Sequence, residues 1–183
     1  MPLQTLPTSV TISLNSWPRT GTLWETLAAM KLLDLLHPAV VKIELDALDK
    51  DECFEELIDL LVKAGQITDR QSALDAIYAR EDLQTTGIGK GVAIPHGKDP
   101  AITDIRAAAA TSKKGIEFES IDDKPVHLVF LVLAQVNNPG PHLQTLAEIA
   151  ACLNQPGVYD RLVNAQNPDA FLAQLQLPDD GVI

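Results

Sequence analysis

Apolar residues follow two different periods along this chain, one typical of strands and the other typical of helices. Residues 126–134 are almost entirely apolar, which predicts a central strand that is buried on both faces. Apolar and polar residues alternate in residues 40–45, the pattern of a half-buried strand. Residues 92–94 and 105–111 predict two further strands, and residues 115–119 predict a short strand between 105–111 and the central one.

Helical spacing occurs in the first half of the chain after two aspartates that are suited to capping a helix. Asp49 is followed three positions later by Glu52, an acidic version of the capping box, and the apolar spacing continues up to Gly65. Asp69 begins a second helix. That helix ends close to Arg80, which we therefore expect to point into the glycine-rich segment that follows.

Further helices are predicted in the last third of the chain and near its beginning. Residues 137–141 form a loop rich in proline and glycine, and a helix follows from His142. Its apolar face is predicted to consist of Leu143, Leu146, Ile149, Ala150 and Leu153. Pro156 and Pro168 open two short helices over residues 158–165 and 169–175. Residues 22–36 predict an apolar helix that begins at a threonine cap.

Helices and strands interleave, so we expect a single α/β domain with a mixed sheet of four to five strands flanked by helices. The length of 183 residues is sufficient for one hydrophobic core. We place this domain at residues 30–178, between an atypical, flexible N-terminal extension (1–29) and a tail (179–183). Residues 1–29 carry no net charge, so either Met30 is the natural start or the segment is an extension unlike the rest.

The charge and composition exclude several classes of function. A net charge of −11 argues against nucleic-acid binding and against anionic membrane surfaces, and it suits a basic or neutral protein partner. No apolar run approaches the ~18 residues of a membrane span, so no membrane insertion is expected. Cys53 and Cys152 stand far apart in apolar helical patterns, which predicts buried free thiols in a reducing cytoplasm.

The candidate chemistry is concentrated in residues 85–98. Three glycines occupy alternate positions, and a short apolar run then leads to a single histidine, His96, between Pro95 and Gly97. Pro95 fixes its own φ angle and stiffens the backbone that enters His96, while glycine lets another surface come close. An imidazole presented in this way is suited to nucleophilic or proton chemistry near neutral pH.

These residues resemble a known family. The run Gly-Ile-Gly-x-Gly-x-Ala-Ile-Pro-His-Gly is similar to the motif of enzyme IIA of the bacterial phosphoenolpyruvate:sugar phosphotransferase system, of the fructose–mannitol and nitrogen-regulatory type. Arg80-Glu81 stands where that family carries an active-site arginine, and His142-Leu143-x-x-Leu146 matches a downstream motif of the family. The resemblance covers roughly residues 30–175. The chain departs from the family at Lys90, where asparagine is common.

The resemblance implies a phosphotransferase of the α/β enzyme IIA fold in which His96 becomes a phosphohistidine. Its donor would be an HPr-type phosphocarrier, and Arg80 and His142 would hold the phosphoryl oxygens. Supporting positions are Thr85, Thr86, Gly87 and Gly89, although both threonines suit turn formation equally well. Taken alone, Arg80 reads as a surface arginine at a helix end, and His142 as an unpartnered histidine at a helix start. No cofactor or metal is required.

The sequence leaves the cellular role open between two branches of that family. We expect a regulatory protein of the nitrogen type acting on a target protein; the alternative is a sugar-transport component that passes phosphate to enzyme IIB. Two hypotheses from other classes of function are a binding module that is not phosphorylated and a metal site built on His96 and His142. The P-loop, Rossmann and HExxH signatures are missing. His37 and His127 are expected to be a surface histidine and a strand-edge histidine.

Overall fold

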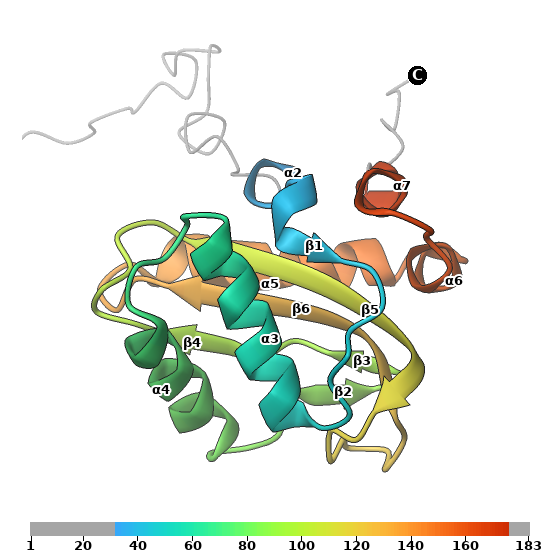
Figure 1. Cartoon of the computed structure of the whole chain (residues 1–183), viewed down its shortest axis with the longest axis horizontal. Coiled ribbons are helices and arrows are strands. Elements are labelled where there is room, and N and C mark those ends of the chain that lie inside the picture. The colour runs from blue at the N-terminus through green and yellow to red at the C-terminus, as the bar shows by residue number, and fades with distance from the viewer. Residues whose placement is uncertain (1–31, 176–183) are drawn as a thin grey trace, which may run out of the picture.

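The two longest strands form an antiparallel pair at the centre of the molecule. In the computed structural model, which describes residues 32–175, β5 (Arg106–Ile116) pairs with β6 (Val126–Ala134) from Arg106 opposite Leu133 to Thr111 opposite Leu128. All but one of the residues of β6 are buried, and helices lie over both faces of the sheet (Figure 1). The prediction of a central buried strand at 126–134 is confirmed.

Four short strands complete a six-stranded mixed sheet in the order β1-β5-β6-β3-β2, with β4 also paired to β6. Strand β1 (Val41–Lys42) runs parallel to β5, and β3 (Val92–Ala93) runs parallel to β6. Strand β2 (Gly87–Gly89) lies antiparallel to β3 at the edge of the sheet. Strand β4 (His96–Lys98) continues the line of β3 along β6, with His96 opposite Val132.

The sheet differs from the predicted one in how the strands are divided. It has six strands rather than four to five because the glycine-rich segment itself forms β2 and β4. The separate strand predicted at 115–119 is wrong, since β5 runs on to Ile116 through an irregularity in its pairing after Thr111. Gly115 lies in that stretch with φ +82°, a conformation that glycine adopts without strain. The strand predicted at 40–45 is reduced to β1, and Pro38–Val40 form a short 3-10 helix (η1).

The two helices of the first half lie together on one face of the sheet (Figure 1). Helix α3 (Lys50–Lys63) begins after Asp49, whose side chain accepts from the Glu52 N–H, and α4 (Arg70–Glu81) begins after Asp69, whose side chain accepts from the Ser72 N–H. Both predicted caps are confirmed. Helix α3 packs on β5, whereas α4 packs on β4.

Helix α5 (Pro139–Leu153) covers β6 from the opposite face, together with α6 (Val158–Val163) (Figure 1). It begins three residues before the predicted start at His142, because proline is tolerated in the first turn of a helix. The predicted apolar face was also wrong in part: Leu143 is 63% exposed and Ala150 is exposed. The buried residues of this helix are His142, Thr145, Ile149 and Cys152.

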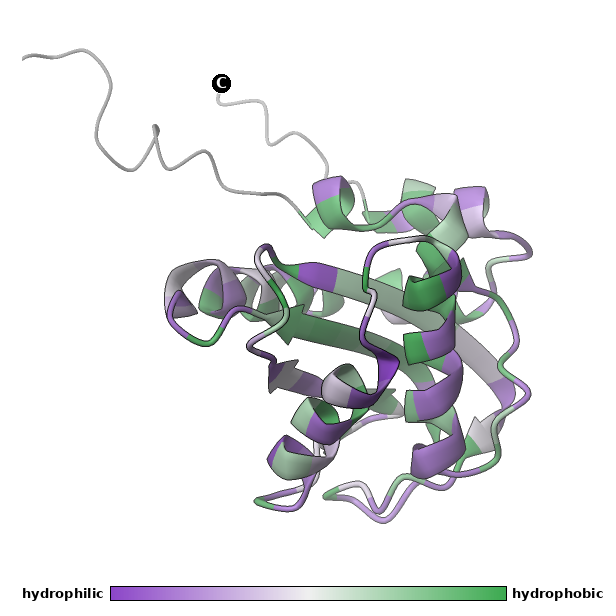
Figure 2. Cartoon of the chain, turned by 60° about the vertical axis from the view of Figure 1, so that its left-hand side comes forward, coloured by the Kyte–Doolittle hydropathy of each residue, from purple (hydrophilic) through white to green (hydrophobic). Residues whose placement is uncertain are grey.

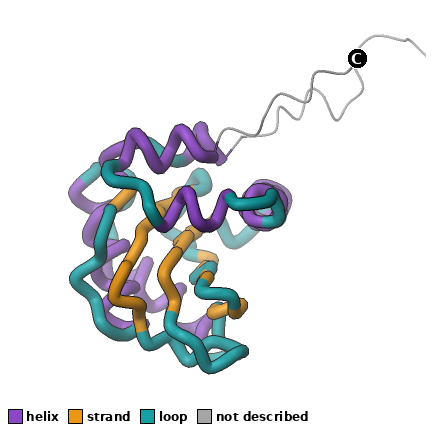
Figure 3. The backbone as a smooth tube through the Cα atoms, turned by 90° about the vertical axis from the view of Figure 1, so that its right-hand side faces the viewer, coloured by secondary structure: helices purple, strands orange, loops and turns teal. Residues whose placement is uncertain are grey.

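The ends of the described chain lie side by side. Helix α2 (Leu32–Leu35) contacts both α5 and α7 (Pro168–Leu175). Figure 3 shows the helices on both sides of the strands, and Figure 2 shows apolar residues concentrated in the strands and on the inner sides of the helices. Most of the helix predicted at 22–36 lies outside the described residues, as do both domain boundaries at 30 and 178, which stay predictions. None of the helices between residues 32 and 175 combines the length and the apolar character that crossing a membrane requires.

Candidate active site

Gly97 explains why the end of α4 lies beside His96. A Cβ atom at Gly97 would lie 2.6 Å from the Ala76 carbonyl oxygen, a distance that real side chains do not reach. Only a glycine therefore lets β4 pack directly against the backbone of α4. This close packing carries Arg80, in the last turn of α4, to the first residue of β4, which is His96.

Arg80 and His96 form the central hydrogen bond of the site. The Arg80 Nε donates to His96 Nε2 over 3.1 Å, and the Arg80 Nη1 donates to the Gln84 carbonyl over 2.9 Å. A guanidinium has no acceptor, so Nε2 must be the acceptor and the imidazole proton must lie on Nδ1. That Nδ1–H donates to the Ile94 carbonyl over 2.8 Å. The lone pair, and with it the nucleophilic character, belongs to Nε2.

The second imidazole comes from α5. The ring centroids of His96 and His142 lie 5.3 Å apart, with the ring planes inclined by 46°. His142 is only 6% exposed, and its buried Nδ1 has no hydrogen-bond partner among the described residues. The structure thus brings together the three residues predicted for the site, Arg80, His96 and His142.

Both imidazoles are held in the neutral form near pH 7. Burial lowers the pKa of His142 to about 4, with further lowering by His96, Lys98 and Arg80. Burial is also the main cause that lowers the pKa of His96; Arg80 adds to it, while the Ile94 carbonyl and Glu81 act in the opposite direction. A neutral imidazole is the form that can attack an electrophile, so this environment keeps Nε2 available as a nucleophile.

The two threonines of the glycine-rich loop have their hydroxyls engaged inside the protein. Thr86 is buried, and its N–H and Oγ1 both donate to Glu81 Oε2, at 2.9 and 2.6 Å. Thr85 Oγ1 donates to the Phe118 carbonyl over 3.4 Å and accepts from the Gly87 N–H over 3.2 Å. These contacts are those of loop formation, and a role of either hydroxyl in phosphate binding stays a prediction.

The loop between β2 and β3 is shaped by glycine and by one residue that is not glycine. Gly89, Lys90 and Gly91 all have positive φ angles, of +81°, +56° and +76°. The Lys90 N–H donates to Asp122 Oδ2 over 2.9 Å, which ties the loop to the β5–β6 connection. A Cβ at Gly87, in β2, would lie 2.6 Å from Ser120 Oγ and 2.9 Å from Ser120 Cα, so close packing requires glycine there.

Glu81 was not singled out from the sequence, although it contacts the loop that leads to His96. It is 7% exposed and occupies the last position of α4. An acidic residue is disfavoured at the C-terminal end of a helix, where the helix dipole is negative. A sequence signal therefore existed, namely an acidic residue directly after the candidate arginine at a predicted helix end.

The other two histidines lie where the sequence predicted. His37 is exposed on the surface, and His127 lies at the start of β6 with its Nδ1 against the Ser112 carbonyl at 2.8 Å. Cys53 and Cys152 are buried free thiols, which confirms that prediction. Among residues 32–175, no group of three or more His, Cys, Asp or Glu side chains is arranged to hold a metal ion.

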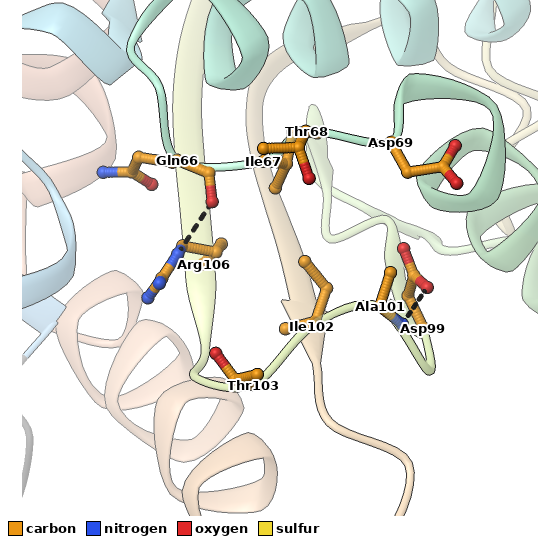
Figure 4. Close-up of a pocket in the computed structure, with 9 residues that line it drawn as sticks. All are labelled: Gln66, Ile67, Thr68, Asp69, Asp99, Ala101, Ile102, Thr103 and Arg106. Carbon is orange, nitrogen blue, oxygen red and sulfur yellow. Dashed lines mark hydrogen bonds between the residues drawn. The ribbon is translucent and has the colours of Figure 1, made fainter.

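A cavity of about 170 Å³ lies between the α3–α4 loop and the β4–β5 loop (Figure 4), and neither His96 nor His142 lines it. Arg106 Nε donates to the Gln66 carbonyl at one end of it, and the Ala101 N–H donates to Asp99 Oδ1 at the other. Asp99 Oδ1 also accepts from the Ser72 hydroxyl over 2.7 Å. These contacts tie the loop after β4 to its neighbours, and none of the predicted site residues lines the cavity.

Comparison with known proteins places the chain in one family. Residues 34–177 match the model of the phosphoenolpyruvate-dependent sugar phosphotransferase system, EIIA 2. A fructose-specific EIIA component from Haloferax volcanii is 38% identical over 142 residues, which are 78% of this chain and 87% of that protein. A nitrogen regulatory protein from Bradyrhizobium diazoefficiens is 35% identical over 151 residues, 81% of this chain and 97% of that protein. A fructose-specific EIIABC component from Bacillus subtilis is 34% identical over 143 residues, 78% of this chain, but the chain spans only 22% of that longer protein.

Solved structures share the fold. The nitrogen regulatory protein IIA-Ntr from Neisseria meningitidis aligns with a TM-score of 0.73 and 28% identity, over 79% of this chain and 98% of that one. Enzyme IIA of the mannitol system from Escherichia coli, solved in complex with phosphorylated enzyme IIB, aligns with a TM-score of 0.66 over 76% of this chain and 96% of that one. At 23% identity, the second likeness concerns the fold alone.

Proposed function

The chain belongs to the EIIA 2 family of the phosphoenolpyruvate-dependent sugar phosphotransferase system, and we propose that it relays a phosphoryl group through His96. The observation that carries this proposal is the hydrogen bond from Arg80 Nε to His96 Nε2, at 3.1 Å. It leaves the lone pair on Nε2, at the side of the ring where a fixed cation stands. Transfer of an anionic phosphoryl group requires a nucleophile with a cation beside it, and here the imidazole nitrogen and the guanidinium are in direct contact.

The transfer exchanges one phosphorus–nitrogen bond for another. The Arg80 Nε–H releases the Nε2 lone pair of His96 and turns to the phosphoryl oxygens. His96 Nε2 then attacks the phosphorus of a phosphohistidine on the carrier, in line with the bond that breaks, and the carrier imidazole leaves with the electron pair of that bond. The His96 ring keeps its proton on Nδ1 and becomes positively charged as the new bond forms. The Ile94 carbonyl, already hydrogen bonded to Nδ1, stabilises that charge.

Arg80 and His142 would stabilise the phosphoryl group on His96. The guanidinium offers donors in a planar arrangement that fits phosphate oxygens. His142 is neutral near pH 7, because its pKa is about 4, so one of its nitrogens carries a proton and can donate without charge. Positioning and charge neutralisation of this kind are the main contributions of a protein to phosphoryl transfer.

The donor would be an HPr-type carrier, and the surface around the site suits a protein partner. Three large apolar side chains lie close in sequence to site residues and are exposed: Leu83 at 80%, Ile88 at 48% and Leu143 at 63%. Leu143 follows His142 directly, and Ile88 stands between Gly87 and Gly89. Exposed apolar side chains at these positions of the chain would give a protein partner apolar contact area.

For the acceptor, we favour a regulatory target protein, as in the nitrogen-regulatory branch to which the relative from Bradyrhizobium diazoefficiens belongs by name. The second candidate is enzyme IIB of a sugar transporter. It is supported by the 38% identity to a fructose-specific EIIA component, and a mannitol enzyme IIA has been solved with its phosphorylated enzyme IIB. Both roles belong to the cytoplasm, where the two free thiols would stay reduced.

The test is phosphorylation with phosphoenolpyruvate, enzyme I and an HPr-type carrier, followed by mapping of the acid-labile phosphate. We expect one phosphate per chain on His96 and none in a His96→Ala variant. His127→Ala is the matched control, because it removes another half-buried imidazole and should label fully. Full labelling of His96→Ala would exclude the proposal, and absence of labelling in the wild type would favour the binding module. Incubating the labelled protein with enzyme IIB then separates the two roles, since only the transport role predicts transfer of the label.

A further inference from the structure

Glu81 is a buried carboxylate in an unfavourable place. It is 7% exposed, it ends α4 where the helix dipole is negative, and its Oε1 has no hydrogen-bond partner among residues 32–175. Each of these features costs stability, and an apolar residue at this position would avoid all three. Unfavourable features that persist are concentrated at functional sites, so we asked what Glu81 holds.

The other carboxylate oxygen of Glu81 holds the start of the glycine-rich loop at two points. Oε2 accepts from the Thr86 N–H over 2.9 Å and from the Thr86 hydroxyl over 2.6 Å. Thr86 is thereby fixed in position immediately before β2. Hydrogen bonds to a charged acceptor are stronger than those between neutral groups, which suits a fixed attachment.

Thr86 is in turn linked to His96 by a short series of hydrogen bonds. The Thr86 carbonyl accepts from the Ile94 N–H over 3.0 Å, and the Ile94 carbonyl accepts from His96 Nδ1 over 2.8 Å. Ile94 thus lies between Thr86 and the imidazole, and a shift of Thr86 would move the carbonyl that holds the ring proton. The series is a mechanical connection through successive backbone groups.

The last turn of α4 therefore holds the imidazole of His96 at both nitrogens. Arg80 contacts Nε2 directly, and Glu81, the next residue, acts on Nδ1 through Thr86 and Ile94. The two contacts together select one tautomer and one orientation of the ring. Because both come from adjacent residues of one helix, they keep a fixed geometry relative to each other.

We propose that Glu81 is a positioning residue for phosphoryl transfer, which fixes the tautomer and orientation of His96 through Thr86 and Ile94. The inference rests on the proposed function only where it concerns the effect of Glu81 on phosphoryl transfer. Its effect on the tautomer concerns the free protein and can be measured without any phosphoryl donor.

Three variants separate the parts of this connection. Glu81→Leu removes the acceptor, Glu81→Gln keeps an acceptor oxygen without the charge, and Thr86→Val replaces the hydroxyl by a methyl group of similar shape. Thr111→Val is the matched control, because Thr111 is equally buried but lies in β5, where its Oγ1 accepts from the Glu44 N–H. It makes the same chemical change away from His96.

The measurements are the imidazole ¹⁵N shifts of His96, single-turnover transfer from the phosphorylated carrier, and the melting temperature. We expect Glu81→Leu to lower the Nδ1–H fraction of His96 and to slow transfer by about tenfold, since small displacements of a reacting group are costly. Glu81→Gln should be intermediate in both, while Thr111→Val should leave both unchanged even where it lowers the melting temperature.

If Glu81→Gln and Thr86→Val keep the wild-type tautomer and rate while melting at a lower temperature, Glu81 has only a structural role and the inference is wrong. If Glu81→Leu does not fold, the inference can still be tested, because Glu81→Gln and Thr86→Val give the tautomer and the transfer rate without it. A wild-type protein that takes up no phosphate would exclude the proposed function, and the ¹⁵N shifts would still decide whether Glu81 sets the tautomer.

Discussion

The imidazoles of His96 and His142 lie with their ring centroids 5.3 Å apart, although they come from β4 and α5 and are separated by the whole β5–β6 hairpin. Two imidazolium ions at this separation, beside Arg80, would repel each other. Burial and this charge environment lower the pKa of both groups, so the pair is neutral near pH 7. One ring can then act as a nucleophile while the other donates a hydrogen bond.

The first prediction concerns the stability of the protein at acidic pH. The pKa of His142 is about 4 in the folded protein and near the ordinary value of about 6.5 in the unfolded chain, so the unfolded chain binds more protons between these limits. The free energy of unfolding should therefore fall as the pH falls from about 6.5 toward 4, by on the order of 3 kcal/mol from this group. Urea unfolding of the wild type and of His142→Gln across that range measures it. A variant that loses stability as steeply as the wild type would contradict the prediction; His37→Gln provides the same substitution at an exposed site.

A second prediction separates catalysis from folding at Arg80. Arg80 is only half-buried, so Arg80→Ala should leave the melting temperature nearly unchanged. Transfer should slow by roughly tenfold to a hundredfold, because a charge-assisted hydrogen bond of about 1.5–3 kcal/mol is lost from the transition state. Arg80→Lys should restore only part of the rate, since an ammonium lacks the planar donors. Single-turnover transfer from the phosphorylated carrier is the measurement, and a wild-type rate in Arg80→Ala would exclude the site as described.

The third prediction tests the contact between β4 and α4. In Gly97→Ala, the added Cβ would meet the Ala76 carbonyl oxygen at 2.6 Å, so α4 must move away from β4. We expect a loss of about 1–3 kcal/mol in stability and a slower transfer, because Arg80 moves with the helix. Gly140→Ala is the control, because its Cβ would meet only Asn138 Oδ1, at 3.8 Å. Equal melting temperatures and rates for the two variants would show that the close packing is unimportant.

A fourth prediction concerns Lys90, which has a φ angle of +56°. A left-handed conformation costs a residue with a side chain about 1–2 kcal/mol relative to glycine, and asparagine tolerates it better than lysine does. Lys90→Gly and Lys90→Asn should therefore raise the melting temperature, with a gain of about 1 kcal/mol for glycine. Lys113, an exposed lysine in β5, is the control position, where the same changes should lower stability. A lower melting temperature for Lys90→Gly would contradict the explanation.

Features that depend on residues near each other in sequence were predicted well. Asp49 and Asp69 cap α3 and α4 because a short side-chain oxygen reaches an N–H three residues on, an interaction contained in one turn. The apolar run at 126–134 became the central strand for a similar reason, since composition alone shows that it avoids water. His96 stood out through its setting between proline and glycine, and Arg80 and His142 were found through the resemblance of their motifs, while the contacts among the three were not visible in the sequence.

Features that depend on packing were missed or misplaced. The buried face of α5 was predicted from its leucines, but the helix presents His142 and Thr145 to the interior and leaves Leu143 exposed. The hydrophobic period was correct, but the face chosen by the fold is rotated from the leucine-rich one. Glu81 was overlooked although its place at a predicted helix end was a signal, because neither its burial nor its partner Thr86, across the turn that follows α4, is visible in the sequence.

The sequence by itself determined the helix caps, the central strand, the glycine-rich loop and the residue types able to handle a phosphoryl group. All of these follow from local conformational preference and from the chemistry of single side chains. Only the tertiary structure decided that Gly97 brings α4 onto β4, that Arg80 meets Nε2 of His96, and that α5 places His142 beside it. The reason is physical: tautomer, pKa and nucleophilicity depend on distance and burial, and these arise when segments far apart in the chain pack against one another.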